Sequence, residues 1–239
     1  MAGSYEMNMT SGPLLGKILT FSFPLMCSGV LQLLFNAADI IVVGRYTGHT
    51  ALAAVGSTSA LINLIVNLFV GLSVGANVLI ARSYGAKNMD AVHKGVHTAM
   101  LTAVVGGVFL IFVGVAASRP MLSLMGTPDD VIDQATLYLR IYFVGAPSLL
   151  VYNFGAAILR AVGDTRRPLY FLTLAGIINV VLNLIFVIAF SMGVAGVALA
   201  TIISQTVSAY LIVICLQHNT GAFRLVLLRL VEIGDVFGP

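Results

Sequence analysis

Charged residues are scarce in this chain of 239 residues. Only 9% of the sequence is charged, 59% is hydrophobic, and the mean hydropathy is +1.03. Ordinary soluble domains carry roughly 25% charged residues, so 12 Lys and Arg and 9 Asp and Glu residues could not cover a globule of this size. This scarcity excludes a soluble fold and predicts that lipid surrounds most of the side chains.

Other absences narrow the function. The two cysteines, Cys27 and Cys215, fall in apolar stretches, where a thiol behaves as a small hydrophobe. The sequence has no Walker A loop, no HExxH, no GxSxG and no Cys or His cluster with metal-ligand spacing. The net charge is +3, but the basic residues sit in short loops, which argues against nucleic acid. The sequence therefore predicts no enzyme, no ATP hydrolysis and no cofactor.

Long charge-free runs dominate what is present. Each is long enough to cross a bilayer, which takes about 20 apolar residues, and the last is long enough for two crossings, with a natural break at Ser191, Met192, Gly193 and Gly196. The runs cover residues 18–38, 46–81, 95–118, 141–159 and 168–223. We therefore expect an all-α integral membrane bundle of six helices, over 18–43, 52–84, 96–117, 135–159, 169–191 and 194–216.

The loops predict the orientation of the chain. Nine Lys and Arg residues would lie on one side of the membrane and three on the other, so the positive-inside rule places both termini in the cytoplasm. The expected organisation is a cytoplasmic segment over 1–17, a six-helix transmembrane lobe over 18–217, and a cytoplasmic interfacial helix or linker over 218–239. On the outer side, Thr127, Pro128 and Asp130 are expected at the N-cap, N1 and N3 positions of the fourth helix.

One carboxylate lies inside a hydrophobic stretch. Asp39 follows Gln32 and Asn36 at i, i+4, i+7 spacing, so the three share one helix face. Because an ionisable group within a membrane is costly and usually marks a site, we expect this face to look into the bundle or a watered cavity. The alternative is that Asp39 lies at the outer rim and pairs with Arg45.

Further polar stripes occur in other spans. Ser, Thr and Asn commonly hold membrane helices together, and Ser59, Ser204 and Ser208 are interpreted in this way. Asn179 and Asn183, at i, i+4 spacing, could equally hold helices together or offer oxygens to an ion or a ligand. Pro24, inside the first span, removes a backbone hydrogen bond and marks a possible hinge. The full stripes comprise Ser59, Asn63 and Asn67; Thr173, Gly176, Asn179 and Asn183; and Thr201, Ser204, Gln205 and Ser208.

Several segments together resemble the multidrug and toxic compound extrusion (MATE) family of secondary transporters. They cover most of residues 13–217 in family order: LLFNAADIIVVGRYTG, ALAAVGSTSALINL, SVGANVLIARSYGAKN, ILRAVGDTRRPLYFLTLAGIINVVLNLIFVIAF and MGVAGVALATIISQTVSAYL. The resemblance implies one lobe of a two-lobed antiporter of the plasma (bacterial inner) membrane. Such antiporters export organic, often cationic and amphipathic, compounds in exchange for H⁺ or Na⁺.

The resemblance also implies roles for individual residues. Asp39 takes the place of the family's first-helix acid, and Pro24 that of its kinking proline. A cation-coupling site would comprise Asp39, Asn179, Asn183 and Thr201, with a possible Na⁺ at Asp39, Asn179 and Asn183; the substrate cavity would include Gln32, Asn36, Asn63, Asn67 and Asn153. The chain departs from many relatives at Asn183, where they carry an aspartate, so the coupling ion stays open between H⁺ and Na⁺.

For the chain as a whole, the sequence leaves one expectation and two alternatives. We expect it to be truncated before a second lobe, and therefore to work with that lobe or with a second copy of itself. A lipid-linked sugar flippase of the wider superfamily would line its cavity with basic residues, which the spans almost lack. In a non-transporting scaffold or isolated fragment, Asp39 and the asparagines would only hold helices together.

Overall fold

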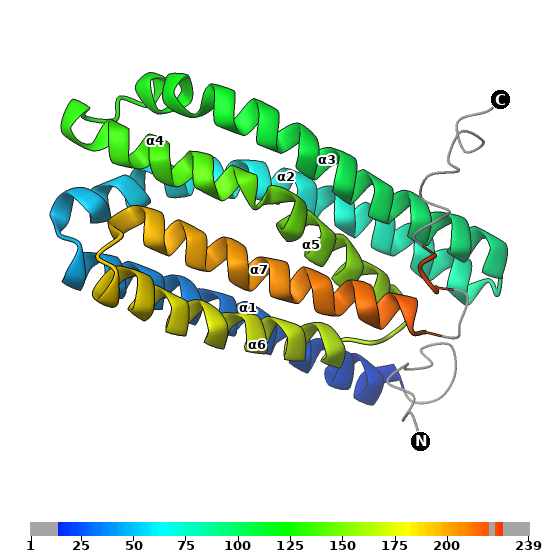
Figure 1. Ribbon diagram of the computed structural model, residues 1–239. Coiled ribbons are helices and arrows are strands. Elements are labelled where there is room, and N and C mark those ends of the chain that lie inside the picture. Colours follow the sequence, from blue (N-terminus) through cyan, green and yellow to red (C-terminus); the bar gives the residue numbers. More distant parts are fainter. Residues whose placement is uncertain (1–13, 220–222, 227–239) are drawn as a thin grey trace.

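The computed structural model describes residues 14–219 and 223–226, which form a helical bundle without strands (Figure 1). The predicted all-α membrane fold is confirmed. The elements in chain order are α1 (Leu14–Tyr46), α2 (His49–Gly85), α3 (Met89–Leu124), α4 (Asp129–Val144), α5 (Ala146–Ala161), α6 (Arg166–Leu184), the short π-helix η1 (Ile185–Ala189) and α7 (Gly193–Gln217).

The fourth predicted span is broken. Among the described residues, five helical segments are long and apolar enough to cross a membrane, and α4 with α5 makes a sixth if the bent pair is one span. The two helices meet at Gly145 at an angle of 49°. Pro147 lies in the first turn of α5 and has no N–H to continue the ladder of α4. Helices α1, α2, α3 and α7 extend beyond the predicted spans at both ends, whereas α6 with η1 begins and ends earlier than the predicted fifth span.

An even number of crossings returns the chain to its starting side. The beginning of α1 and the end of α7 lie at the same end of the bundle (Figure 1). The first turn of α6 lies at that end as well, and we call it the terminal end. Whether the terminal end faces the cytoplasm stays a prediction from the distribution of basic residues.

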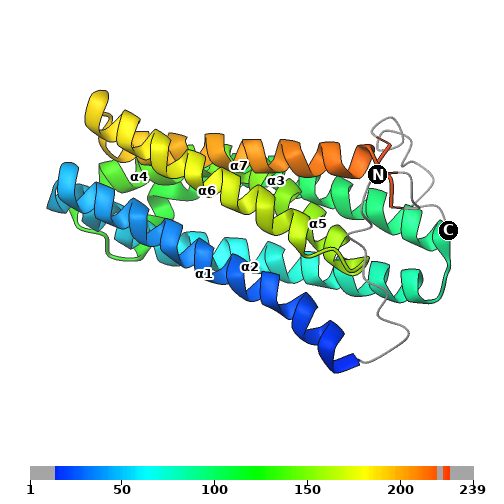
Figure 2. The same ribbon diagram turned by 90° about the horizontal axis from the view of Figure 1, so that it is seen from below.

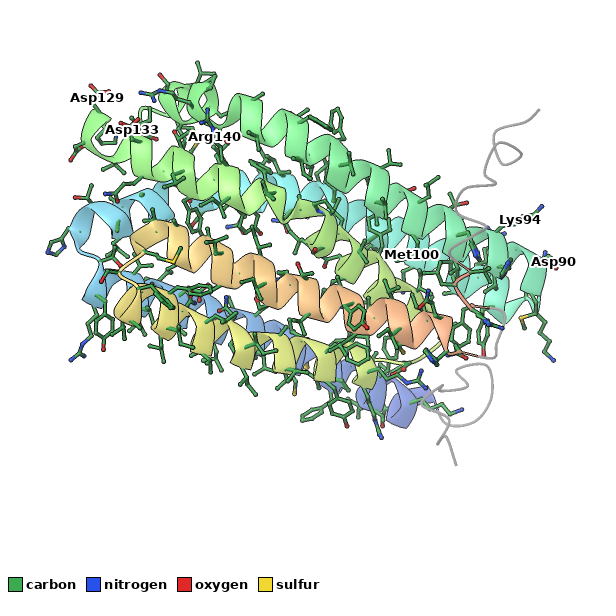
Figure 3. The ribbon with its side chains drawn as sticks, viewed as in Figure 1. Asp90, Lys94, Met100, Asp129, Asp133 and Arg140 are labelled. Carbon is green, nitrogen blue, oxygen red and sulfur yellow. The ribbon has the colours of Figure 1, made fainter. Side chains whose placement is uncertain are left out.

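Glycines allow α3 to pack closely against the bent pair. A Cβ at Gly107 would lie 2.4 Å from the Cα of Pro147, and one at Gly114 would meet the ring of Phe143. Met100, also on α3, is buried in the same layer (Figure 3). The packing core of the bundle therefore lies around α3, α4 and α5.

The predicted cap of the fourth helix is wrong. Helix α4 has Pro128, not Thr127, at its N-cap and makes no side-chain cap bond. Instead, the carbonyl oxygen of Pro128 accepts the N–H groups of Val131 and Ile132, each at 3.0 Å. Nearby, Asp133 (labelled in Figure 3) pairs with Arg119 of α3 at 2.9 Å, and both side chains are exposed. Within the acidic cluster, Asp133 thus joins α4 to α3 at the surface.

The helix break predicted near residues 191–196 is confirmed at residues 191–193. After η1, Ser191 (φ 51°) and Gly193 (φ 59°) adopt left-handed backbone conformations that stop the helix, whereas Gly196 lies inside α7.

Of the interfacial helix predicted over 218–239, only 218–219 and 223–226 are described. Residues 224–226 have no regular secondary structure, and Phe223 and Leu225 are buried.

Candidate functional site: a polar centre between α1, α6 and α7

The intramembrane acid meets an amide of the sixth helix. The Nδ2 of Asn183, on α6, donates a hydrogen bond to Oδ1 of Asp39, on α1. The helices approach closely because Gly176, two turns before Asn183, leaves room for the ring of Phe35. Figure 2 shows α1 and α6 as neighbouring long helices. Asp39 makes no ion pair with Arg45 among the described residues, so the alternative in which the two pair at the rim is wrong.

The hydrogen bonds continue from Asp39 to the seventh helix. Asn183 Nδ2 also donates to Asn179 Oδ1 at 3.3 Å, and Asn179 Nδ2 lies 3.4 Å from Thr201 Oγ1 on α7. Thr201 in turn donates to the carbonyl oxygen of Val197 at 3.0 Å. All four residues singled out for cation coupling therefore form one chain of hydrogen bonds, which we call the polar chain. Their role in coupling stays a prediction.

One oxygen in the polar chain has no partner. Asn183 is completely buried, both hydrogens of its Nδ2 are used, and its Oδ1 has no hydrogen bond. A buried acceptor without a donor costs about 1–3 kcal/mol. Together with the Asp39 carboxylate, this amide oxygen offers the hard oxygen ligands that alkali and alkaline-earth cations prefer, or an acceptor for a proton carried by Asp39.

The amides assigned to a substrate cavity are placed differently. Gln32 and Asn36 are exposed on α1, and Asn63 and Asn67 are exposed on α2. Asn153 is half-buried and donates to Leu149 of its own helix at 2.9 Å. Within the described lobe, only the Asp39 end of the first-helix stripe turns toward other helices. The four exposed amides lie on α1 and α2, and the contact of all five with a substrate stays a prediction.

Sequence reasoning missed an aromatic neighbour of the acid. Tyr138, on α4, is buried and interacts electrostatically with Asp39. Its ring stacks on that of Tyr142, with centroids 6.4 Å apart. The i, i+4 spacing of two tyrosines within a span was the available signal. Tyr138 therefore lies within electrostatic range of the acid in the polar chain.

Among the described residues, the bundle has six crossings when the bent α4–α5 pair counts as one, and a half-buried acid, Asp39, in a hydrogen-bonded polar chain. These are features of a polytopic transporter. Residues 24–185 match the family model described as MatE. The chain belongs to the MATE family of multidrug efflux transporters.

Individual relatives agree with this assignment. The chain is 33% identical over 196 residues to the probable multidrug resistance protein YoeA of Bacillus subtilis, covering 80% of this chain and 42% of that protein. It is 28% identical over 214 residues to a FAD transporter of Shewanella oneidensis, covering 86% and 47%. A crystal structure of MATE in the bent conformation superposes with a TM-score of 0.83 at 30% identity, covering 93% and 48%. The chain thus spans about half the length of the relatives it matches.

Proposed function

We propose that this chain is one lobe of a cation-coupled antiporter that exports organic, cationic and amphipathic compounds, with the polar chain as its coupling site. The observation that carries the proposal is the buried Oδ1 of Asn183, which lacks a partner beside Asp39. A cation bound between these two groups would supply what the amide oxygen lacks.

The coupling ion would act by reversing a hydrogen bond. While Asp39 is ionised, it accepts from Asn183 Nδ2. A proton on Asp39 makes the carboxyl a donor, and a Na⁺ there requires oxygens, so both events favour rotation of the Asn183 amide to present Oδ1. That rotation removes the donation to Asn179 and loosens the link through Thr201 to α7.

Coupling to a substrate requires that the ion bind one conformation better than the other. The polar chain joins α1 to α6 and α7, so ion binding would alter how α1 sits against the bundle. Pro24, inside α1, is the position at which we expect the helix to bend. Because rocking of one half against another drives such transporters, we propose that export needs a second lobe or a second copy of the chain.

The expected charge of the substrate follows from the lobe itself. Asp39 is the one carboxylate that the sequence places within an apolar stretch, and the neighbouring open face carries uncharged amides. A cation can exchange with H⁺ or Na⁺ at this carboxylate, whereas a sugar diphosphate carrier would require basic groups. One relative is a FAD transporter, so an anionic dinucleotide is the competing ligand that the experiment should include.

The test compares Asp39→Asn with Asp133→Asn, which removes an exposed acid elsewhere in the same way. Binding of a fluorescent organic cation and of FAD to the purified protein is measured at pH 6 and pH 8, with and without Na⁺. We expect cation binding to weaken about fivefold or more at pH 6 or in Na⁺. This dependence should disappear in Asp39→Asn and persist in Asp133→Asn.

Two outcomes would contradict the proposal. Asp39→Asn could retain the full pH and Na⁺ dependence with its helical content unchanged, which would remove Asp39 from coupling. Alternatively, FAD could bind while the cation does not, which would reverse the expected substrate charge. Loss of folding in both Asp39→Asn and Asn183→Ala, with Asp133→Asn folded, would instead favour the scaffold alternative.

A further inference from the structure

An open groove lies between residues 19–24 of α1 and residues 166–170 of α6, at the terminal end of the bundle. It has a volume of about 550 Å³. Helix α1 contributes Leu19, Thr20, Phe23 and Pro24, and helix α6 contributes Arg166, Leu169 and Tyr170. Figures 1 and 2 show that both helices start at this end, so the residue numbers on each helix increase with depth.

The groove is polar at its mouth and apolar deeper in. Arg166 is the first residue of α6, and its exposed guanidinium has no hydrogen bond or ion pair within the described part of the chain. Leu19, Phe23 and Leu169 follow within about two turns, and at 1.5 Å per residue the lining spans roughly 7 Å of depth. A charged mouth above an apolar channel has the polarity of a phospholipid, with its phosphate above its acyl chains.

The neighbouring charges leave Arg166 available. The backbone N–H groups of Arg166 and Arg167 both donate to Oδ1 of buried Asp164 at 3.1 Å, so the start of α6 is already capped. The same carboxylate forms an ion pair with the side chain of Arg167 at 3.1 Å. Anion binding here therefore falls to the Arg166 side chain, not to the helix terminus.

We propose that this groove, the α1–α6 groove, binds one anionic phospholipid, with its phosphate on Arg166 and an acyl chain along Leu19, Phe23 and Leu169. Tyr170, which is 58% exposed and follows Leu169, adds an aromatic ring to the apolar part of the lining. Basic pockets between membrane helices bind anionic head groups by this combination of charge and apolar contact. The occupant is a lipid and not free phosphate, because the apolar lining gains nothing from an inorganic ion.

The test measures lipid retained by the full chain in mixed micelles by native mass spectrometry. The probes are dioleoyl phosphatidylglycerol, dioleoyl phosphatidylcholine and glycerophosphoglycerol, which has the anionic head group without acyl chains. The variants are Arg166→Gln, Arg166→Lys and Phe23→Ser. Arg82→Gln is the matched control, because Arg82 is an exposed arginine in the last turn of α2, outside the groove.

The proposal predicts preferential retention of one phosphatidylglycerol over phosphatidylcholine. Arg166→Gln should reduce that preference about fivefold, Arg166→Lys should keep most of it, and Arg82→Gln should leave it unchanged. Phe23→Ser should weaken both lipids, and glycerophosphoglycerol should not be retained. Equal retention of the two lipids, equal losses in the Arg166→Gln and Arg82→Gln variants, or retention of the head group alone would overturn the proposal.

Discussion

Helices α5 and α1 are both apolar, yet the bundle treats them in opposite ways. In α5, nine of sixteen residues are buried, and Ile158 and Leu159 are completely inaccessible. In α1, large apolar side chains stay open, including Leu33 at 70% and Phe23 at 68% exposure. Composition does not separate the two helices, so their different burial reflects position in the bundle.

The proposed coupling acid lies on the loosely held helix. Asp39 and two of the exposed amides, Gln32 and Asn36, lie on α1, whose open faces are available to lipid and to a partner, whereas α5 is enclosed by its neighbours. Elements that move belong to the less stable parts of a fold. A helix held mainly along one side, through Gly176 and Asn183 of α6, can shift without disrupting the core around α3 and α5.

The largest effect is expected where the core is tightest. Gly107→Ala would place a methyl group 2.4 Å from the backbone of Pro147, and backbone cannot move aside cheaply. We expect a loss of about 1–3 kcal/mol in the free energy of unfolding, measured by thermal or denaturant unfolding in detergent. Gly71→Ala is the control, because no atom lies within 4 Å of the new Cβ. Equal losses in the two variants would contradict the contrast between core and open face.

The contact between α1 and α6 should be more forgiving. In Gly176→Ala the new methyl group meets only the far edge of the Phe35 ring, which can rotate. We expect about 1 kcal/mol of destabilisation and a wider separation of α1 from α6, measured by the distance between spin labels on the two helices. Phe35→Leu combined with Gly176→Ala should restore the separation. An unchanged distance in Gly176→Ala would show that this contact does not position Asp39.

A smaller, local effect is expected at His97. Its Nε2 accepts the N–H of Val226 at 3.1 Å, while Nδ1 faces the carbonyl oxygen of His93 at 2.8 Å. His97→Phe removes the acceptor, at a cost of about 1 kcal/mol, so the Val226 amide should exchange its hydrogen about fivefold faster. Thr102→Ala, on the exposed side of the same helix, is the control. Unchanged exchange would mean that Phe223 and Leu225 alone hold this segment.

The smallest effect is expected at the surface pair Arg119 and Asp133. The two side chains are 59% and 76% exposed, and water screens an ion pair of this kind. Arg119→Gln should change the free energy of unfolding by less than about 0.5 kcal/mol. Changing the salt concentration should not make this difference larger. A larger loss would mean that the α3–α4 connection contributes more to stability than its exposure indicates.

The sequence predicted the polar centre better than its surroundings. The spacing of Asn179 and Asn183 and the isolation of Asp39 singled out residues that do lie together, because helical periodicity converts spacing directly into a shared face. The same reasoning missed Tyr138, whose neighbour Asp39 lies about a hundred residues away along the chain. It also misplaced the cap of α4 by one residue, because Pro128 satisfies the first turn through its carbonyl oxygen and not through a neighbouring side chain.

By itself, the sequence determined that this chain is a membrane-embedded helical bundle, because lipid tolerates long charge-free runs only as helices whose backbone groups pair within the segment. Its resemblance to the MATE family came from the ordered sequence motifs. Tertiary structure decided which of those equally apolar helices is buried, how the fourth span bends at Gly145, and that Asn183 reaches Asp39 with one oxygen unpaired. These features depend on close contacts such as Phe35 against Gly176, which join residues far apart in the chain and leave no periodic trace in the sequence.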